Sequence, residues 1–269
     1  MCTRRHVALV SRQPQCASRV QRLGERDTCL ALAALAVIAL IGSLLFVPRI
    51  LQRSAPATFG QQLSVLAQPR LLLVYAITAL GYGGTFLSFT YLASILQDVT
   101  GFSANAVSGV LLVYGVSVAI GNLWGGRLAD RRGPIPALKL IFALLAAVLF
   151  MLTFTAYNTW LVLLTVLALG AVAFGNVPGL QVYVVKQAQR FAPQAADVAS
   201  GLNIAAFNVG IALGASLGGL VVDHIGLMHT PWLGALVVMG AFGLTALSGR
   251  LDRRDGVADR ADGIAVTAH

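Results

Sequence analysis

The side chains of this sequence that could do chemistry are neutral polar and aromatic groups set inside long apolar segments. One group recurs at alternating steps of three and four residues, which places it along one face of a helix. Its members are Tyr75, Thr78, Tyr82, Thr85 and Phe89. Further polar residues of other apolar segments are Tyr114, Ser117, Asn176, Gln181, Asn203 and Asn208. An uncompensated amide or hydroxyl is unfavourable in hydrocarbon, so these groups must face other helices or water.

Two interpretations of these polar groups follow from their chemistry. They form hydrogen bonds between helices, or they line a cavity that binds an uncharged or amphipathic solute. No Asp, Glu, His, Lys or Arg lies deep within an apolar segment, so the chain has no obvious group to carry a proton through a membrane. The Cys and His residues form no ligand cluster, and no apolar segment pairs a nucleophile with a base. The sequence therefore predicts no catalytic residue, no metal site and no cofactor.

Composition places the apolar segments in a lipid bilayer. The chain has 269 residues, of which 57% are hydrophobic and 11% are charged, whereas a soluble domain carries about 25% charged residues. Every acid and base lies at or outside the end of an apolar segment, so no segment has the charged face of a water-facing helix. The net charge of +9 comes from loops and tails, which indicates membrane topology and not nucleic-acid binding.

The apolar segments are long enough to cross a bilayer, which takes about 20 residues of helix. They predict an all-α polytopic membrane protein with about seven transmembrane helices. The expected spans are residues 28–47, 71–96, 104–124, 137–157, 159–183, 200–224 and 232–248. The expected domains are a polar Arg-rich tail at 1–27, a helix at 28–48, a linker at 49–70, a six-helix bundle at 71–249 and a tail at 250–269. Both tails are polar and are expected to be poorly ordered.

Basic residues are distributed unevenly between the two ends of the expected spans. Those between spans and in the C-terminal tail fall in alternate gaps, which include Arg131, Lys186 and Arg250. The positive-inside rule places these gaps, the linker 49–70 and the C-terminus in the cytoplasm. The arginines of the tail 1–27 fall on the opposite side, so either the first segment does not span or the tail is foreign to this architecture. The second explanation is favoured, because a truncated or frame-shifted longer protein would start in this way.

A charged segment between the third and fourth expected spans reads Gly-Arg-Leu-Ala-Asp-Arg-Arg-Gly at residues 126–133. Asp130 is expected to cap the next helix and to complement its dipole, while Arg131 stays among the lipid headgroups. Gly126 and Gly133 are expected to permit a tight reversal of the chain. The alternative interpretation is a plain charged loop that only fixes topology.

Glycines recur at intervals of four residues in three of the expected spans. The sets are Gly121 and Gly125, then Gly175 and Gly179, then Gly210, Gly214 and Gly218. Small residues at this spacing let helix backbones approach closely in lipid, so they predict helix packing. Pro178 lies beside the second set and predicts a kink, which is either a gating hinge or static.

The segment 126–133 resembles motif A of the major facilitator superfamily. Residues 113–116 (Val-Tyr-Gly-Val) and 121–126 (Gly-Asn-Leu-Trp-Gly-Gly) are similar to helix 8 of its arabinose-efflux-permease-like drug:proton antiporters. Residues 199–223 are similar to helix 11 of the same proteins. The resemblance covers residues 29–250 and implies that the seven spans correspond to helices 6–12 of a twelve-helix transporter, without helices 1–5.

This resemblance implies roles for the residues named above. Asp130 and Arg131 would help to lock the two halves of a transporter together on the cytoplasmic side. Helices 7, 8, 10 and 11 would line the cavity, which agrees with the spans that hold the polar residues. The implied function is efflux of a small uncharged or amphipathic solute, such as a sugar or a drug-like molecule, by a truncated form without its own proton-coupling residues.

Two alternatives remain beside a truncated transporter. One is a half-transporter that pairs with a second copy of itself. The other is a seven-helix receptor-like membrane protein, which the number of spans suggests. The chain is expected in a bacterial inner membrane with its C-terminus in the cytoplasm. Its expected partners are the lipid bilayer, a small-molecule substrate, and either a missing N-terminal half or a second copy.

Overall fold

The computed structural model describes residues 65–266, with side chains as far as Asp255, and short stretches between residues 30 and 45. The chain forms two compact units, residues 1–54 and 55–269. Every regular element of the described residues is a helix. Six helical segments of the second unit, called the crossing segments below, are long and apolar enough to cross a membrane. This confirms the all-α polytopic fold class.

The first unit holds the first expected span, residues 28–47. Its described residues, between Leu30 and Leu45, are all helical and nearly all exposed. The rest of that span, the tail 1–27 and most of the linker 49–70 lie outside the described residues. The expectations for these segments therefore stay predictions.

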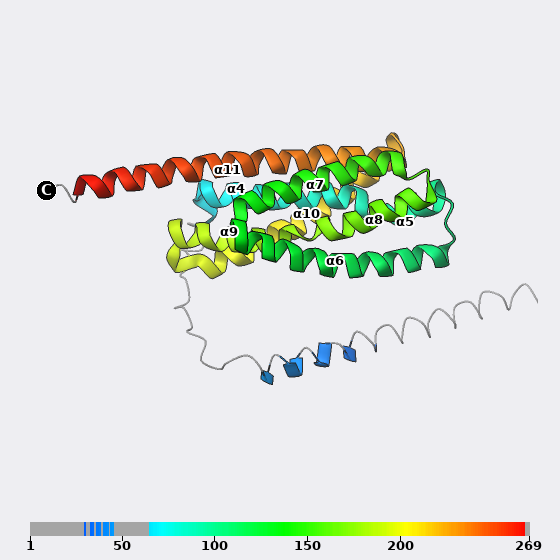
Figure 1. The fold of residues 1–269 in the computed structure, drawn as a ribbon, viewed down its shortest axis with the longest axis horizontal. Coiled ribbons are helices and arrows are strands. Elements are labelled where there is room, and N and C mark those ends of the chain that lie inside the picture. Colours follow the sequence, from blue (N-terminus) through cyan, green and yellow to red (C-terminus); the bar gives the residue numbers. More distant parts are fainter. Residues whose placement is uncertain are drawn as a thin grey trace, which may run out of the picture. The chain divides into compact units, whose positions relative to one another are not determined.

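In the described part of the second unit, a short helical stretch at residues 65–67 precedes α4 (Pro69–Phe89), which is followed by the short α5 (Leu92–Ser94) and a π-helical turn (Ile95–Val99). The later elements are α6 (Ala104–Arg132), α7 (Pro134–Thr155), α8 (Thr159–Ala173), α9 (Asn176–Phe191), a 3₁₀ turn (Pro193–Ala195), α10 (Ala196–His224), a second 3₁₀ turn (Leu227–His229) and α11 (Thr230–Val266). Figure 1 shows the long helices of this unit side by side. Each of the last six expected spans corresponds to one crossing segment, although the span 137–157 runs two residues past the end of its segment at Thr155. Helices α8 and α9 together make one crossing segment.

The local sequence explains where several helices begin. Pro69 and Pro134 stand in the first turns of α4 and α7, where the missing N–H of proline is not needed. The side-chain oxygen of Ser103 accepts a hydrogen bond of 3.3 Å from the backbone N–H of Ala106 and so caps α6. Asn158 caps α8 in the same way. Such caps satisfy N–H groups that have no partner within the helix.

Three helices extend well beyond their expected ends. Helix α6 continues past Trp124 to Arg132, α9 past Tyr183 to Phe191, and α11 past Ser248 to Val266. Residues 250–266, which were expected to belong to a tail, therefore continue helix α11. Hydropathy falls where a chain leaves the bilayer, but a helix satisfies its own backbone hydrogen bonds and has no physical reason to end there.

The expected span 159–183 is divided into α8 and α9. Gly175 is the N-cap residue of α9, and Pro178 is its third helical residue. The first four N–H groups of a helix have no intrahelical partner, so proline is tolerated at this position. Gly179 lies against α7, where an added Cβ would come within 3.2 Å of Leu138.

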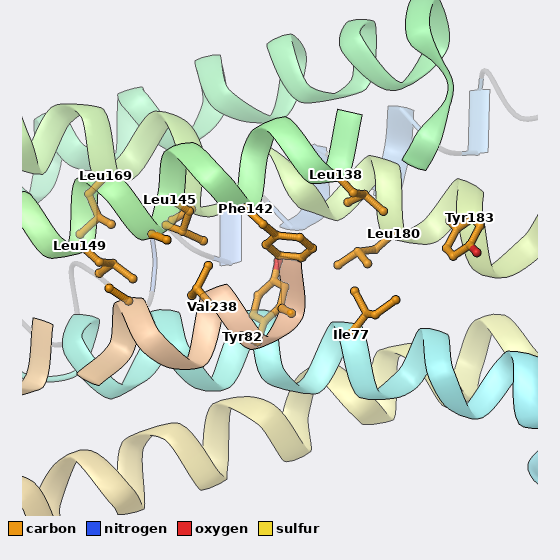
Figure 2. Packing of buried hydrophobic residues seen from close by; sticks show 14 of the residues in the cluster. Ile77, Tyr82, Leu138, Phe142, Leu145, Leu149, Leu169, Leu180, Tyr183 and Val238 are labelled. Carbon is orange, nitrogen blue, oxygen red and sulfur yellow. The ribbon is translucent and has the colours of Figure 1, made fainter. Parts of the chain in front are cut away.

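The core of the second unit includes residues of α4, α7, α9 and α11. Phe142 of α7 is fully buried, and its ring lies over α4, where a Cβ on Gly81 would come within 2.7 Å of it. Figure 2 shows Phe142 beside Tyr82, with Leu138 and Val238 on either side. Lipid is as apolar as these side chains, so their close packing stabilises the unit through dispersion contacts.

Glycines bring two pairs of helices into backbone contact. A Cβ on Gly210, Gly214 or Gly218 of α10 would meet a carbonyl oxygen of α4 at 2.6 Å or less. On α6, a Cβ added to Gly121 would lie 2.1 Å from the carbonyl oxygen of Ala171 on α8. A Cβ added to Gly125 would lie 1.9 Å from the carbonyl oxygen of Gly175, between α8 and α9. These positions leave no room for a larger side chain.

Helices α6 and α10 leave most of their surface uncovered within this unit. In the most apolar part of each helix, only 17% of the residues are buried, compared with 67% in the crossing segment Pro69–Val99, which contains α4. Large apolar side chains, such as Leu112 and Leu123 on α6 and Leu213 and Leu220 on α10, are more than half exposed. In a membrane protein such faces contact lipid or another polypeptide.

Candidate functional site

A chain of hydrogen bonds links α4, α10 and α9. The hydroxyl of Thr78 on α4 donates to Oδ1 of Asn203 on α10 (2.7 Å), and Nδ2 of Asn203 donates to Oε1 of Gln181 on α9 (3.2 Å). Gln181 also donates through Nε2 to the hydroxyl of Ser200. Thr78 and Asn203 are fully buried. These four side chains, called the polar network below, satisfy one another between three helices, as polar groups in lipid must.

An aromatic cluster lies on α4 and its neighbours. Its members are Tyr82, Phe86, Phe89, Tyr114, Phe174 and Phe207. Tyr82 of α4 meets Phe207 of α10 edge to face, with ring centroids 4.2 Å apart. Phe89 of α4 stacks on Tyr114 of α6 at 5.1 Å. Both arrangements are favourable for aromatic rings.

Six side chains have buried polar atoms without a hydrogen-bond partner among the described residues: Arg70, Ser88, Tyr114, Thr153, Asn176 and His229. Two of them lie in or beside the aromatic cluster: Tyr114, unpartnered at its hydroxyl, and Asn176, unpartnered at both amide atoms. Tyr114 belongs to the aromatic cluster, and Asn176 follows its member Phe174 by two residues. Buried polar groups are nearly always hydrogen-bonded, and an unsatisfied one is unfavourable by about 1–3 kcal/mol. These atoms are therefore candidates to bind a solute.

The remaining predicted polar residues belong to neither the polar network nor the aromatic cluster. Tyr75 donates from its hydroxyl to the backbone carbonyl of Ala199 on α10 (3.3 Å). Thr85 is buried and donates to a carbonyl of its own helix. Asn208 also donates to its own helix and is exposed on α10. Ser117 packs its Cβ against the glycine at position 170 of α8.

The charged segment 126–133 belongs to helix α6 and its end, and not to a loop. Asp130 and Arg131 are exposed in the last turn of α6, where the helix dipole favours the base. The N-cap residue of α7 is Gly133, and no side chain caps this helix, so the expected capping by Asp130 is wrong. Gly133 makes the reversal with a φ of 82°. Gly126 lies inside α6 and takes no part in the turn, which corrects its expected role.

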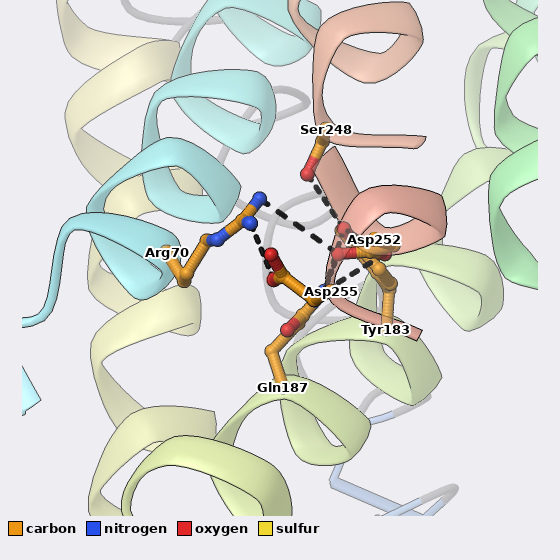
Figure 3. Close-up of polar contacts among 6 residues, drawn as sticks. All are labelled: Arg70, Tyr183, Gln187, Ser248, Asp252 and Asp255. Atoms are coloured by element: carbon orange, nitrogen blue, oxygen red, sulfur yellow. Dashed lines mark hydrogen bonds and ion pairs between the residues drawn. The ribbon is translucent and has the colours of Figure 1, made fainter. Parts of the chain in front are cut away.

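A cluster of charged and polar side chains joins α4, α9 and α11. Asp252 of α11 accepts hydrogen bonds from the Tyr183 hydroxyl (2.9 Å) and the Gln187 amide (2.9 Å), both on α9. Arg70 of α4 forms an ion pair with Asp255 and lies 4.0 Å from Asp252. Figure 3 shows these side chains converging from the three helices.

This cluster was not predicted from the sequence, because its acids were assigned to a disordered tail. Its spacing held a usable signal. Ser248, Asp252 and Asp255 follow one another at steps of four and three, and Tyr183 and Gln187 are four apart. Each set therefore lies on one helical face, and the Tyr183 hydroxyl lies 2.6 Å from the Ser248 hydroxyl.

The sequence profile of the Major Facilitator Superfamily matches residues 28–203. The chain belongs to this superfamily. It is 52% identical to the "uncharacterized MFS-type transporter YtbD" of Bacillus subtilis over 87% of this chain and 59% of that protein. It is 34% identical to the "inner membrane transport protein YdhP" of Escherichia coli K12 over 86% of this chain and 58% of the relative. A "probable sugar efflux transporter" of Pasteurella multocida is 30% identical over 80% of this chain and 51% of the relative.

Membership of the major facilitator superfamily confirms the resemblance drawn from the sequence motifs. The superfamily consists of transporters, which agrees with the prediction that the chain is not an enzyme. The chain spans about three fifths of the length of its first two relatives. Six crossing segments and bacterial relatives make it a multi-pass protein of the bacterial inner membrane.

Proposed function

We propose that this chain forms one half of a transporter that moves a small uncharged or amphipathic solute, such as a sugar or a drug-like molecule, out of a bacterial cell. The observation that carries the proposal is the presence of unpartnered polar atoms on Tyr114 and Asn176 in or beside the aromatic cluster. Aromatic surface with a few polar atoms is typical of sites that bind such solutes. Efflux is the activity named for the Pasteurella multocida relative.

The predicted polar residues are proposed to form one wall of the substrate cavity. Tyr114 and Asn176 would contact the solute, and the aromatic cluster would stack against its apolar part. The polar network of Thr78, Asn203 and Gln181 would hold α4, α9 and α10 in register, because each of its members bonds to another helix. Asn208 and Ser117 would complete the wall on α10 and α6.

The exposed faces of α6 and α10 are proposed to pack against the rest of the transporter. The relatives carry about two fifths of their length outside the matched part, and this part would supply the opposing half. No Asp, Glu, His, Lys or Arg lies away from the ends of the crossing segments, so proton coupling would depend on that half. A second copy of this chain is the alternative occupant of the same faces.

The ends of the helices support a proposal for orientation. Arg131, Lys186 and Arg250 lie in the parts of α6, α9 and α11 that extend beyond the expected spans. The positive-inside rule assigns this side to the cytoplasm, and the C-terminus would lie there as well. Asp130 and Arg131 are exposed at the same end of α6. We assign to them a contact with the opposing half that closes the cytoplasmic side.

A chimera tests the proposed function. Residues 65–269 of this chain are joined to the part of the Bacillus subtilis relative that they do not match, and efflux of neutral sugars and amphipathic dyes is measured from loaded vesicles. The chimera is expected to transport at least one of these solutes, and the isolated chain none by proton-coupled efflux. A chimera that reaches the membrane but transports no solute of the panel would contradict the proposal, as would robust efflux by the isolated chain.

The site itself is tested by removing one hydroxyl from the chimera. Tyr114→Phe is expected to weaken solute binding by about threefold to tenfold, because one hydrogen bond is lost. Tyr157→Phe is the matched control, since Tyr157 is 69% exposed in the turn after α7 and outside the aromatic cluster. Equal effects of the two substitutions would remove Tyr114 from the site.

A further inference from the structure

A cavity of about 320 Å³ lies between the start of α7, the end of α9 and α11. Its lining on α7 is apolar and consists of Pro134, Ile135 and Pro136. The lining on α9 and α11 is polar and consists of Tyr183, Lys186, Gln187, Arg190 and Asp252. One side of this cavity therefore suits hydrocarbon, and the other suits a charged group.

Bases surround the polar side of the cavity. Lys186 and Arg190 are exposed and stand four residues apart on α9, so their charged groups project from the same face of the helix. Lys139 of α7 lies close by. A Cβ added to Gly249 of α11 would lie 3.7 Å from the Nζ of Lys139 and 2.7 Å from Ile135, which lines the cavity.

The one acid in the cavity lining is already engaged by other groups. Asp252 accepts hydrogen bonds from Tyr183 and Gln187 and lies 4.0 Å from Arg70. Within residues 65–255, whose side chains are described, Lys186 forms no ion pair with an acid. The cavity therefore presents an excess of positive charge. Three of its lining residues, Tyr183, Gln187 and Asp252, are held in place by hydrogen bonds to one another.

We propose that this cavity binds the phosphate group of an anionic phospholipid, held by Lys186 and Arg190. A guanidinium group offers paired N–H donors that match phosphate oxygens, and an ammonium group adds a second charge. Pro134, Ile135 and Pro136 would contact the start of an acyl chain. A basic pocket between transmembrane helices on the cytoplasmic side is suited to such headgroups.

The position of the cavity fits a headgroup. The cavity lies near the ends of the crossing segments Thr159–Phe191 and Leu227–Asp255, where polar headgroups meet the hydrocarbon. The orientation proposed above makes this the cytoplasmic leaflet. A lipid bound here would contact α7, α9 and α11 together. A ligand that binds only the folded state stabilises it by mass action, so the bound lipid is expected to raise the melting temperature.

The test uses the full chain purified in detergent and does not depend on transport. Thermal melting is measured during titration with phosphatidylglycerol, phosphatidylethanolamine or inorganic phosphate, and retained lipid is counted by native mass spectrometry. Phosphatidylglycerol is expected to raise the melting temperature and to remain bound. Combining Lys186→Gln with Arg190→Gln is expected to weaken this binding by about tenfold or more, as two headgroup contacts are lost.

A second pair of substitutions separates a site from general surface charge. Arg253→Gln combined with Arg254→Gln removes the same charge from exposed positions on α11 that do not line the cavity. This pair is expected to retain phosphatidylglycerol binding within about twofold, because neither arginine contacts the headgroup. Equal losses in the two double variants would overturn the proposal, because binding would then reflect the basic surface as a whole.

The choice of ligand also decides the outcome. An equal response to phosphatidylethanolamine would overturn the selection of an anionic lipid. Binding of inorganic phosphate with the same affinity would show a site for a free anion and would overturn the lipid assignment. If the Lys186 and Arg190 double variant does not fold, the single variant Lys186→Gln is titrated instead, and an unchanged affinity there would overturn the proposal.

Discussion

The hydroxyl of Thr78 lies 2.7 Å from Oδ1 of Asn203, and this hydrogen bond joins α4 to α10 inside the bundle. Asn203 also donates to Gln181 of α9, so one amide connects three helices. Interhelical hydrogen bonds in membranes contribute about 0.6 kcal/mol on average and up to about 1.7 kcal/mol. An amide that makes two such bonds and is fully buried should lie near the upper end of this range.

Replacing Asn203 is therefore expected to destabilise the bundle more than replacing Thr78. Asn203→Ala leaves Gln181 without one partner and opens a gap, so the free energy of unfolding should fall by about 1–3 kcal/mol. Thr78→Val removes one hydroxyl at nearly constant volume and should lower it by about 0.5–1.5 kcal/mol. Denaturation in mixed micelles measures both values.

Asn208→Ala is the control for this comparison. Asn208 is exposed and bonds only to its own helix, so the substitution should change the free energy of unfolding by less than about 0.5 kcal/mol. If Asn203→Ala and Asn208→Ala are equally mild, the polar network does not hold the helices together.

Glycine packing gives a second prediction. Gly214→Ala would place a Cβ against the carbonyl oxygen of Gly83 on α4, where backbone cannot move away without separating the two helices. A lower melting temperature is expected, together with a loss of about 1–3 kcal/mol of stability from overpacking. Thermal melting of the purified protein provides the measurement.

The matched control for this substitution is Gly115→Ala on α6. A Cβ at Gly115 would have no atom within 4 Å, and alanine is a better helix former than glycine by about 0.5–1 kcal/mol. The control should therefore be neutral or slightly stabilising. A similar loss of stability in both variants would contradict the prediction, because the loss would then not depend on the close backbone contact at Gly214.

The charged cluster of Arg70, Asp252 and Asp255 leads to a third prediction. The side chain of Arg70 is 17% exposed and that of Asp255 is 31% exposed, so their interaction is partly screened by water. Arg70→Gln should lower the free energy of unfolding by about 1 kcal/mol. The difference from the original protein should shrink in 1 M salt, which shortens the Debye length to about 3 Å.

Arg254→Gln serves as the comparison. The substitution removes the same charge, and Arg254 is exposed on α11. It should leave stability nearly unchanged at either salt concentration. A salt-independent loss on Arg70→Gln would instead point to lost packing by the arginine stem. The ion pair would then contribute nothing measurable.

The sequence predicted the helices far better than the contacts between them. Long apolar runs flanked by charges identified each described crossing segment, because hydrophobic thickness fixes the length of a spanning helix. The ends were less well predicted. Charges at Asp130 and Asp252 were taken as signs of a loop and a tail, whereas both residues are helical, since a helix continues into water when its side chains permit.

The candidate site was predictable in its residue types but not in its pairing. Periodicity placed Thr78 and Tyr82 on one face of α4, yet only the three-dimensional arrangement shows that Thr78 bonds to Asn203 while Tyr82 packs on Phe207. The unpartnered atoms of Asn176 had no sequence signal, because satisfaction of a hydrogen bond depends on residues far away in the chain.

Orientation in the membrane gives the last prediction. Gln97 lies in the π-helical turn after α5, and Arg132 is the last residue of α6. Both are exposed, and the crossing segment Ala104–Arg132 separates Gln97 from the end at Arg132. The positive-inside rule places Arg132 in the cytoplasm and Gln97 outside. After the native cysteines are replaced by serine, Gln97→Cys should react with a membrane-impermeant maleimide on intact cells. Arg132→Cys should react only after the membrane is permeabilised, and labelling of both sites from the same side would contradict the proposed topology.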